Sequence, residues 1–160
     1  MSDSICKSSG KSGLPPGSLI HVGEVLETVA SMSVIDYGKG KFEEKKIQSI
    51  DEIIQYKDSE SVTWVTIEGL ADIEVVERIG EIFGIHQLVL EDILNTNQRP
   101  KFEAYDDHLY IVLKCLLSDG ESFAVNNEQV SLLVLKNFVI MFKEKKDELF
   151  HSIQHRIRTS

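Results

Sequence analysis

Two adjacent carboxylates, Glu91 and Asp92, form the pair of side chains best suited to surface chemistry in this sequence. They lie within residues 86–94, where a helical wheel of about 3.6 residues per turn puts the carboxylates opposite the apolar side chains. Leu88 falls between the two carboxylates and faces outward. The apolar arc consists of Val89, Leu90, Ile93 and Leu94. Carboxylates suit cations, although the solvated face of an ordinary surface helix is the simpler explanation of such a pair taken alone.

Histidines and cysteines are weaker candidates. His151 and His155 lie four residues apart on the last predicted helix, a spacing at which two histidines can share a metal such as zinc. The sequence supplies no third ligand beside them, so solvated side chains are the simpler interpretation. Cys6 lies in a Ser/Gly-rich tail and Cys115 in an apolar strand, which are positions too different for a structural disulfide. We interpret Cys115 as a small core residue.

Composition and motifs argue against several classes of function. The net charge of -9 disfavours nucleic acid as a partner, because binding to phosphates needs clustered Lys and Arg. The sequence contains no Gly-x-Ser-x-Gly turn, no glycine-rich dinucleotide loop and no convincing Cys–His pair, so we do not expect an enzyme. It also lacks the roughly 18 uninterrupted apolar residues of a membrane span and the apolar region of a signal peptide. We expect the chain as given to be soluble and intracellular.

The first half of the sequence alternates strands and helices. Residues 1–17 mix Ser, Gly, Lys and Pro and are predicted to be a disordered tail, followed by one domain over residues 18–160. Ser49 and Glu52 form a capping box that opens a short helix reaching about Tyr56. Strands are predicted at residues 19–22, 33–37, 42–48 and 61–68, the second and third paired as a hairpin, and a helix is predicted from Asp72 to Gly84.

After Pro100 the sequence changes to a run of strands. Pro100 favours an extended Arg99, so a strand should follow at once. Short turns make neighbouring strands antiparallel, and the apolar runs at 109–117 and 130–135 indicate central strands covered on both faces. The predicted strands are residues 102–104, 109–117, 123–125, 129–135 and 138–143, and a last helix opens at residues 144–147 and runs to Arg158. This order predicts helices on both faces of a mixed, largely antiparallel sheet.

A family resemblance is carried mainly by residues 88–103, which read Leu-Val-Leu-Glu-Asp-Ile-Leu-Asn-x-x-Gln-Arg-Pro-Lys-x-Glu. The chain here is similar to the soluble cytosolic domain of the CorA family of magnesium transporters. The resemblance covers nearly the whole chain through Gly13-Leu14-Pro15-Pro16-Gly17, Val34-Ile35-Asp36-Tyr37, Val62-Thr63-Trp64-Val65, Leu109 to Leu116, Glu128-Gln129-Val130-Ser131, Lys136-Asn137-Phe138 and Arg156-Ile157-Arg158.

The resemblance implies an α/β fold in the form of an α/β/α sandwich, with a mixed, largely antiparallel central sheet covered by helices on both faces. In the family, the last segment leads into a long stalk helix and two membrane helices. The family's pore signature, Gly-Met-Asn, does not occur in these 160 residues. We therefore expect a truncated domain whose native chain continues past Ser160 and which lies at the cytoplasmic face of the membrane.

The resemblance also assigns a role to the carboxylate pair. Acidic residues in this region of CorA proteins face the neighbouring subunit and take part in sensing cytosolic Mg²⁺, and Asp92 falls on the matching position, with Glu91 beside it. Mg²⁺ keeps most of its waters, so one or two carboxylates suffice to hold it. The resemblance implies a homopentamer for the full-length protein, with Leu88 in a subunit contact and Mg²⁺, or also Co²⁺, as the transported ion. The fragment itself could be a monomer.

Two alternatives remain open at this point. The chain could belong to a relative that transports zinc, cobalt or nickel, since the selecting pore lies outside it. It could also be a purely structural oligomerisation module, in which Glu91 and Asp92 only keep the surface soluble. A soluble enzyme is a third and weaker alternative.

Overall fold

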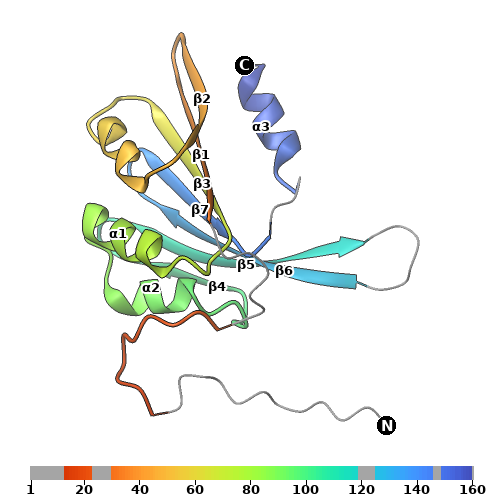
Figure 1. The fold of residues 1–160 in the computed structure, drawn as a ribbon. Coiled ribbons are helices and arrows are strands. Elements are labelled where there is room, and N and C mark those ends of the chain that lie inside the picture. The colour runs from red at the N-terminus through yellow and green to blue at the C-terminus, as the bar shows by residue number, and fades with distance from the viewer. Residues whose placement is uncertain (1–12, 23–29, 119–124, 146–148, 160) are drawn as a thin grey trace.

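The computed structural model describes residues 13–22, 30–118, 125–145 and 149–159, which form one open sheet with helices beside it (Figure 1). The strands are β1 (Ser31–Gly38), β2 (Lys41–Ile47), β3 (Val62–Glu68), β4 (Lys101–Ala104), β5 (Leu109–Ser118), β6 (Val125–Val134) and β7 (Phe138–Lys143). The helices are the 3-10 helix η1 (Ile50–Tyr56), α1 (Ile73–Phe83), α2 (Gln87–Ile93) and α3 (His151–Arg158).

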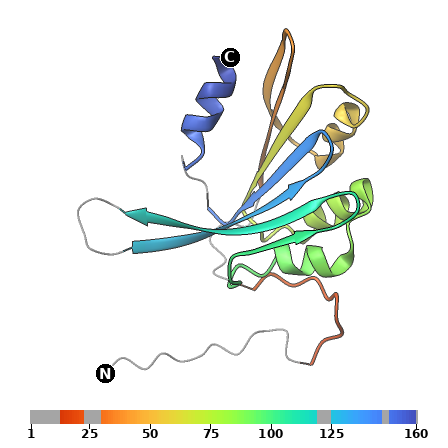
Figure 2. The same ribbon diagram turned by 180° about the vertical axis from the view of Figure 1, so that it is seen from behind.

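The strands follow the order β2-β1-β3-β7-β6-β5-β4 across the sheet. Hydrogen-bonded neighbours are antiparallel except β3 and β7, which run parallel from the pair Thr63–Phe138 to the pair Glu68–Lys143. The β5–β6 hairpin extends beyond the other strands, as both views of the ribbon show (Figures 1 and 2). The parallel contact therefore joins an N-terminal half of the sheet, β1 to β3, to a C-terminal half, β4 to β7.

Helices η1, α1 and α2 cover one face of the sheet, which carries the main hydrophobic core (Figure 1). Because side chains alternate along a strand, every second residue of β1, β3 and β7 points into this core. Its fully buried members include Val34, Val65, Ile79, Ile93 and Phe138. Burial of such side chains contributes roughly 1.5–3 kcal/mol each to stability.

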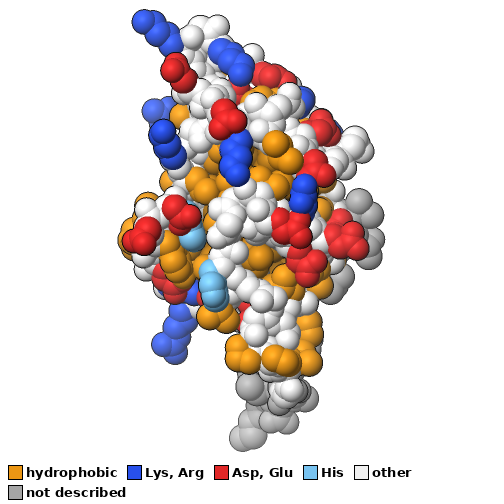
Figure 3. Space-filling view, turned by 90° about the vertical axis from the view of Figure 1, so that its left-hand side faces the viewer, with side chains coloured by type: hydrophobic (Ala, Val, Ile, Leu, Met, Phe, Trp, Pro, Cys, Tyr) orange, Lys and Arg blue, Asp and Glu red, His pale blue; other side chains and the backbone are white. Residues whose placement is uncertain are grey.

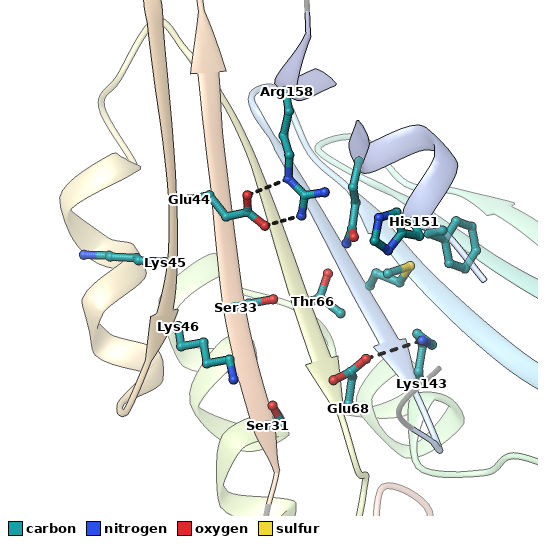
Figure 4. Close-up of a pocket in the computed structure, with 13 residues that line it drawn as sticks. Ser31, Ser33, Glu44, Lys45, Lys46, Thr66, Glu68, Lys143, His151 and Arg158 are labelled. Carbon is teal, nitrogen blue, oxygen red and sulfur yellow. Dashed lines mark hydrogen bonds and ion pairs between the residues drawn. The ribbon is translucent and has the colours of Figure 1, made fainter. Parts of the chain in front are cut away.

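Helix α3 packs on the opposite face, over a smaller cluster. Phe150, just before the helix, meets Trp64 edge-to-face at 6.3 Å between ring centroids. Arg158 at the other end donates to both carboxylate oxygens of Glu44 on β2, at 2.7 and 2.5 Å (Figure 4). Hydrogen bonds from Arg158 lower the pKa of Glu44. An apolar contact and a bidentate ion pair thus hold α3 at its two ends, which gives the second helical layer.

The α/β/α sandwich with a mixed, largely antiparallel sheet is confirmed. The predictions made from local sequence signals are also confirmed at four places. The capping box of Ser49 and Glu52 is present at the start of η1, and Gly84 ends α1 in the left-handed conformation, at φ 69°. The β1–β2 hairpin turns at residues 38–41, and β4 begins directly after Pro100.

Several predicted boundaries differ from the structure. Residues 19–22 form a single bridge, from Val22 to Asn95, instead of a strand. Residue 125 belongs to β6, which runs without a break to Val134, whereas the prediction has separate strands at 123–125 and 129–135. Helix α3 begins at His151, later than the predicted opening at residues 144–147. The run 109–117 is not a central strand covered on both faces, because β5 lies next to the edge strand and Leu113 is 38% exposed. Of the predicted tail, residues 1–12 lie outside the described part of the chain.

A buried carboxylate, Asp36, fixes the end of β1. Its side chain is fully buried and accepts hydrogen bonds from Ser61 Oγ at 2.8 Å and Thr63 Oγ1 at 2.8 Å, and it pairs with Lys41 Nζ at 2.5 Å. Burial alone would raise the pKa of Asp36, but the hydrogen bonds from Lys41, Ser61 and Thr63 outweigh it and lower that pKa. Buried charges are tolerated when paired and hydrogen-bonded in this way.

We predict that Asp36→Asn lowers the free energy of unfolding by about 2–3 kcal/mol at pH 7, because it removes a buried, hydrogen-bonded charge. Since the pKa of Asp36 is lowered on folding, its stabilisation is complete above the ordinary carboxyl value of 3.8 and is lost as the pH falls through the lowered value. Urea denaturation from pH 7 to pH 2.5 measures both effects. Asp51→Asn, at an exposed ion pair with Arg78, is the matched control. Equal losses in the two variants would contradict the prediction.

Candidate functional site

Helix α2 carries the carboxylate pair, and its start is built from local sequence. The His86 side chain accepts a hydrogen bond from the Leu88 backbone N–H at 3.2 Å and caps the start of the helix. Val89, Leu90 and Ile93 are buried in the main core, as the helical wheel predicted. Leu88 is 49% exposed on the other side. The buried arc therefore fixes the rotation of α2 and turns Leu88 and the carboxylates outward.

The turn between α2 and β4 is tied to the sheet by a buried glutamine. The Gln129 side chain on β6 accepts from the Gln98 backbone N–H at 3.1 Å and donates to the Asn95 carbonyl at 2.9 Å. Gln98 Nε2 in turn donates to the Asp92 carbonyl at 2.7 Å. Lys114 Nζ on β5 donates to the Thr96 carbonyl at 2.8 Å. These bonds set the distance between the end of α2 and the first residue of β4.

Asp92 already has a cationic partner within the chain. The Lys101 ammonium pairs with Asp92 Oδ2, lies 3.0 Å from Glu103 Oε1 and sits 5.1 Å from the centroid of the Tyr110 ring. The Asp92 side chain is 35% exposed and that of Lys101 25%. Burial alone would lower the pKa of Lys101, but its hydrogen bonds to Asp92 and Glu103 raise that pKa. The Lys101 ammonium likewise lowers the pKa of Glu103.

Glu91 is held by the N-terminal segment instead. Its Oε2 accepts a hydrogen bond from the Gly17 backbone N–H at 2.7 Å. The same segment continues to Val22, which exchanges backbone hydrogen bonds with Leu94 and Thr96 at 3.0 and 3.1 Å. Residues 14–18 therefore lie across the outer side of α2. On the side of the molecule where α1 and α2 lie, hydrophobic side chains reach the surface next to charged ones (Figure 3).

A cavity of about 450 Å³ lies between this segment and α2. The residues that line it are Leu14, Pro15, Pro16, Ser18, Leu88, Glu91 and Asp92. The structure thus brings together all three predicted site residues around one space. A water molecule takes about 30 Å³ in the liquid, so the cavity has room for a hydrated ion. Carboxylate oxygens beside such a space are the donor type that Mg²⁺ prefers, and the Lys101 ammonium shows that a cation is accommodated at Asp92.

The other candidates are not brought together. His151 and His155 are both exposed on α3, and Cys115 is partly buried beside the smaller apolar cluster. Within residues 13–22, 30–118, 125–145 and 149–159, three or more His, Cys, Asp or Glu side chains nowhere converge as a complete metal-binding group. Asp92 and Glu91 are therefore not part of a group of three such side chains among these residues.

A second cavity, of about 480 Å³, lies between α3 and the sheet (Figure 4). Its charged lining is largely paired within the chain: Arg158 with Glu44 on β2, and Lys143 with Glu68 at 3.4 Å. Lys45 points away from the space in the close-up (Figure 4). The cavity thus lies beside the ion pair of Arg158 and Glu44, which holds α3 to β2, and beside the pair of Lys143 and Glu68, which joins β7 to β3.

Sequence reasoning missed three groups of the site: Lys101, Glu103 and the Gly17 N–H. Lys101 and Glu103 are two residues apart on β4, so a strand assignment alone puts them on one face of the sheet. That this face looks toward Asp92 follows only from the hydrogen-bonded turn before β4. Gly17 lies 74 residues from Glu91, and no local pattern signals that contact.

Comparisons with known proteins agree with this architecture. The family model described as CorA-like Mg²⁺ transporter protein matches residues 59–160. The chain therefore belongs to the CorA family. The cobalt/magnesium transport protein CorA of Thermotoga maritima is 43% identical over 150 residues, which are 94% of this chain and 42% of that protein. The chain thus spans less than half the length of this relative.

Solved structures with the same fold are more distant in sequence. The full-length CmaX protein superposes with a TM-score of 0.65 at 11% identity, over 85% of this chain and 41% of that one. The soluble domain of CorA from Methanocaldococcus jannaschii gives a TM-score of 0.52 at 13% identity, over 83% and 47%. The family is described as one of transporters, in agreement with the expectation that the chain is not an enzyme. None of the helices in the described residues is long and apolar enough to cross a bilayer.

We predict that Glu91→Ala accelerates hydrogen exchange at the Gly17 amide by about tenfold to a hundredfold, because a hydrogen bond to a charged group contributes roughly 1.5–3 kcal/mol. Amide exchange followed by NMR measures it directly. Glu81→Ala removes an exposed carboxylate of α1, paired with Arg78, and is the control. An unchanged Gly17 exchange rate in Glu91→Ala would show that the N-terminal segment is held by other contacts.

Proposed function

We propose that this chain is the cytosolic regulatory domain of a CorA-type magnesium transporter. In this proposal Asp92 and Glu91 help to sense intracellular divalent cations at contacts between protomers, and so gate a pore outside this chain. The observation that carries it is the position of the two carboxylates. In a chain of this family, they lie on an outward helix face, beside an exposed leucine and a cavity large enough for a hydrated ion.

The assembly is part of the proposal. The full-length protein would be a homopentamer at the cytoplasmic face of the membrane, attached through C-terminal membrane helices. Each protomer offers two carboxylates at this surface. One or two carboxylates suffice for a Mg²⁺ ion that retains several waters, so a single chain can bind Mg²⁺ weakly and a neighbour in the assembly adds further oxygen ligands. The 49% exposed Leu88 gives the same surface an apolar contact point.

Gating follows from electrostatics between protomers. When Mg²⁺ is plentiful, ions between facing carboxylates screen their repulsion and favour the closed assembly. When Mg²⁺ is scarce, repulsion returns and the assembly loosens, which is a shift in population caused by the difference in ion affinity between the two states. The name of the Thermotoga maritima relative includes both cobalt and magnesium. We propose that the protein containing this chain handles the same ions, Mg²⁺ and also Co²⁺.

One observation favours a different function, that of a structural assembly domain without metal sensing. The ion pair between Asp92 and Lys101 gives Asp92 a stabilising role within the protomer. On this alternative, the carboxylates of α2 hold β4 and the N-terminal segment in place, and divalent cations have no effect on assembly.

The two functions differ in what Asp92→Asn does. We predict that Mg²⁺ binding by the 160-residue chain, followed by NMR titration, weakens at least about fivefold in Asp92→Asn, because one of two carboxylate ligands is lost. In the assembled transporter the same substitution weakens the protection by Mg²⁺ against proteolysis. Asp106→Asn, in the exposed turn before β5, removes one negative charge as well and is the control. Equal Mg²⁺ affinity in the two variants would leave the structural function as the better account.

A further inference from the structure

The carboxylate site also contains a positively charged group, the ammonium of Lys101. Lys101 Nζ contacts the Asp92 carboxylate, the Glu103 carboxylate and the face of the Tyr110 ring. These three groups come from α2, β4 and β5, so the ammonium lies in a pocket built by separate elements. A lysine held only by a chance surface contact has no such surroundings.

The position of Lys101 is fixed by the backbone. It is the first residue of β4 and is paired in register with Val112 on β5, while Glu103 is paired with Tyr110. The turn before it is bound to Gln129, which is 2% exposed. The backbone of Lys101 therefore stays beside Asp92, and the ammonium can move away from Asp92 only through a change in the side-chain conformation.

A divalent ion that binds Asp92 meets this ammonium at close range. Two cations beside one carboxylate repel each other, and the repulsion is stronger at a partly buried site than in bulk water. When the ammonium leaves Asp92, it can keep its contacts with the Glu103 carboxylate and the Tyr110 ring. When a metal ion displaces the Lys101 ammonium from Asp92, Asp92 is paired with the ion and the ammonium with Glu103, so no buried charge is left without a partner.

We propose that Lys101 is a built-in competitor for the cation site: its ammonium occupies Asp92 when divalent ions are scarce and must be displaced to Glu103 before Mg²⁺ binds. This inference rests on the proposed sensing function and adds what sets its threshold. The ammonium keeps the affinity low, so that the site fills only at high Mg²⁺ concentration. It also partly neutralises Asp92 in the metal-free state, which limits the repulsion between protomers.

The test compares Mg²⁺ affinity in two lysine variants of the 160-residue chain. Lys101→Met keeps the aliphatic stem and removes the charge. Lys57→Met makes the same change in net charge at a lysine that also lies over an aromatic ring, 5.6 Å from the Phe83 centroid, and donates to the Ile82 carbonyl instead of a carboxylate. We expect Lys101→Met to bind Mg²⁺ about tenfold more tightly than Lys57→Met, measured by NMR titration. Equal or weaker binding in Lys101→Met would overturn the competitor role.

Asp92→Asn, introduced into the wild type and into Lys101→Met, separates this inference from the function on which it rests. If Asp92→Asn changes Mg²⁺ affinity in neither background, the sensing function fails and the inference fails with it. If Asp92→Asn weakens binding by the wild type while Lys101→Met matches Lys57→Met, only the competitor role fails.

A measurement on the unaltered chain covers the case in which Lys101→Met does not fold. The ¹⁵N resonance of the Lys101 ammonium should shift during a Mg²⁺ titration with the same midpoint as the backbone amide of Asp92. A Lys101 signal that stays constant while the Asp92 amide shifts would mean that the metal binds without displacing the lysine, and would overturn the proposal.

Discussion

Parallel pairing between β3 and β7 is the contact on which the rest of the molecule depends. It joins strands 75 positions apart in the chain, such as Thr63 with Phe138, and it is the single parallel contact among the described strands. The β1–β3 half and the β4–β7 half meet only there within the sheet. Because β6, β5 and β4 follow β7 outward, this pairing puts β4 at the sheet edge opposite β2, and the turn bound to Gln129 then holds β4 beside α2. The geometry of the carboxylate site therefore depends on contacts with the sheet and not on the acidic helix alone.

Most of the local structure could be read from the sequence, since its signals act over a few residues. The capping box at Ser49, the glycine that ends α1, and the apolar arc of α2 each gave an element or a face correctly. Strand order could not be read in this way. The apolar run of β5 indicated a buried central strand, yet the sheet places it next to the edge, where Leu113 stays partly exposed. Apolar content reports that a strand can be buried, but the topology decides whether a layer covers it.

The site shows the same division between local and distant information. The residue types and the wheel identified Glu91, Asp92 and Leu88, and the structure gathers them at one cavity. Their partners came from elsewhere in the chain: a lysine across a turn for Asp92, and a backbone amide of the N-terminal segment for Glu91. The two neighbouring carboxylates are thus tied to different parts of the chain, Asp92 to β4 and Glu91 to the N-terminal segment.

The two edges of the sheet limit how copies of this molecule can join. Strand β2 forms one edge and carries five charged side chains in seven residues, Lys41, Glu43, Glu44, Lys45 and Lys46, while β4 at the other edge is only four residues long and follows a proline. Short or heavily charged edge strands are poor templates for the addition of a further strand. Growth of the sheet from one molecule into the next is disfavoured at both ends. Contacts between copies must then be made by side chains on the faces and helices, where each substitution can tune them separately.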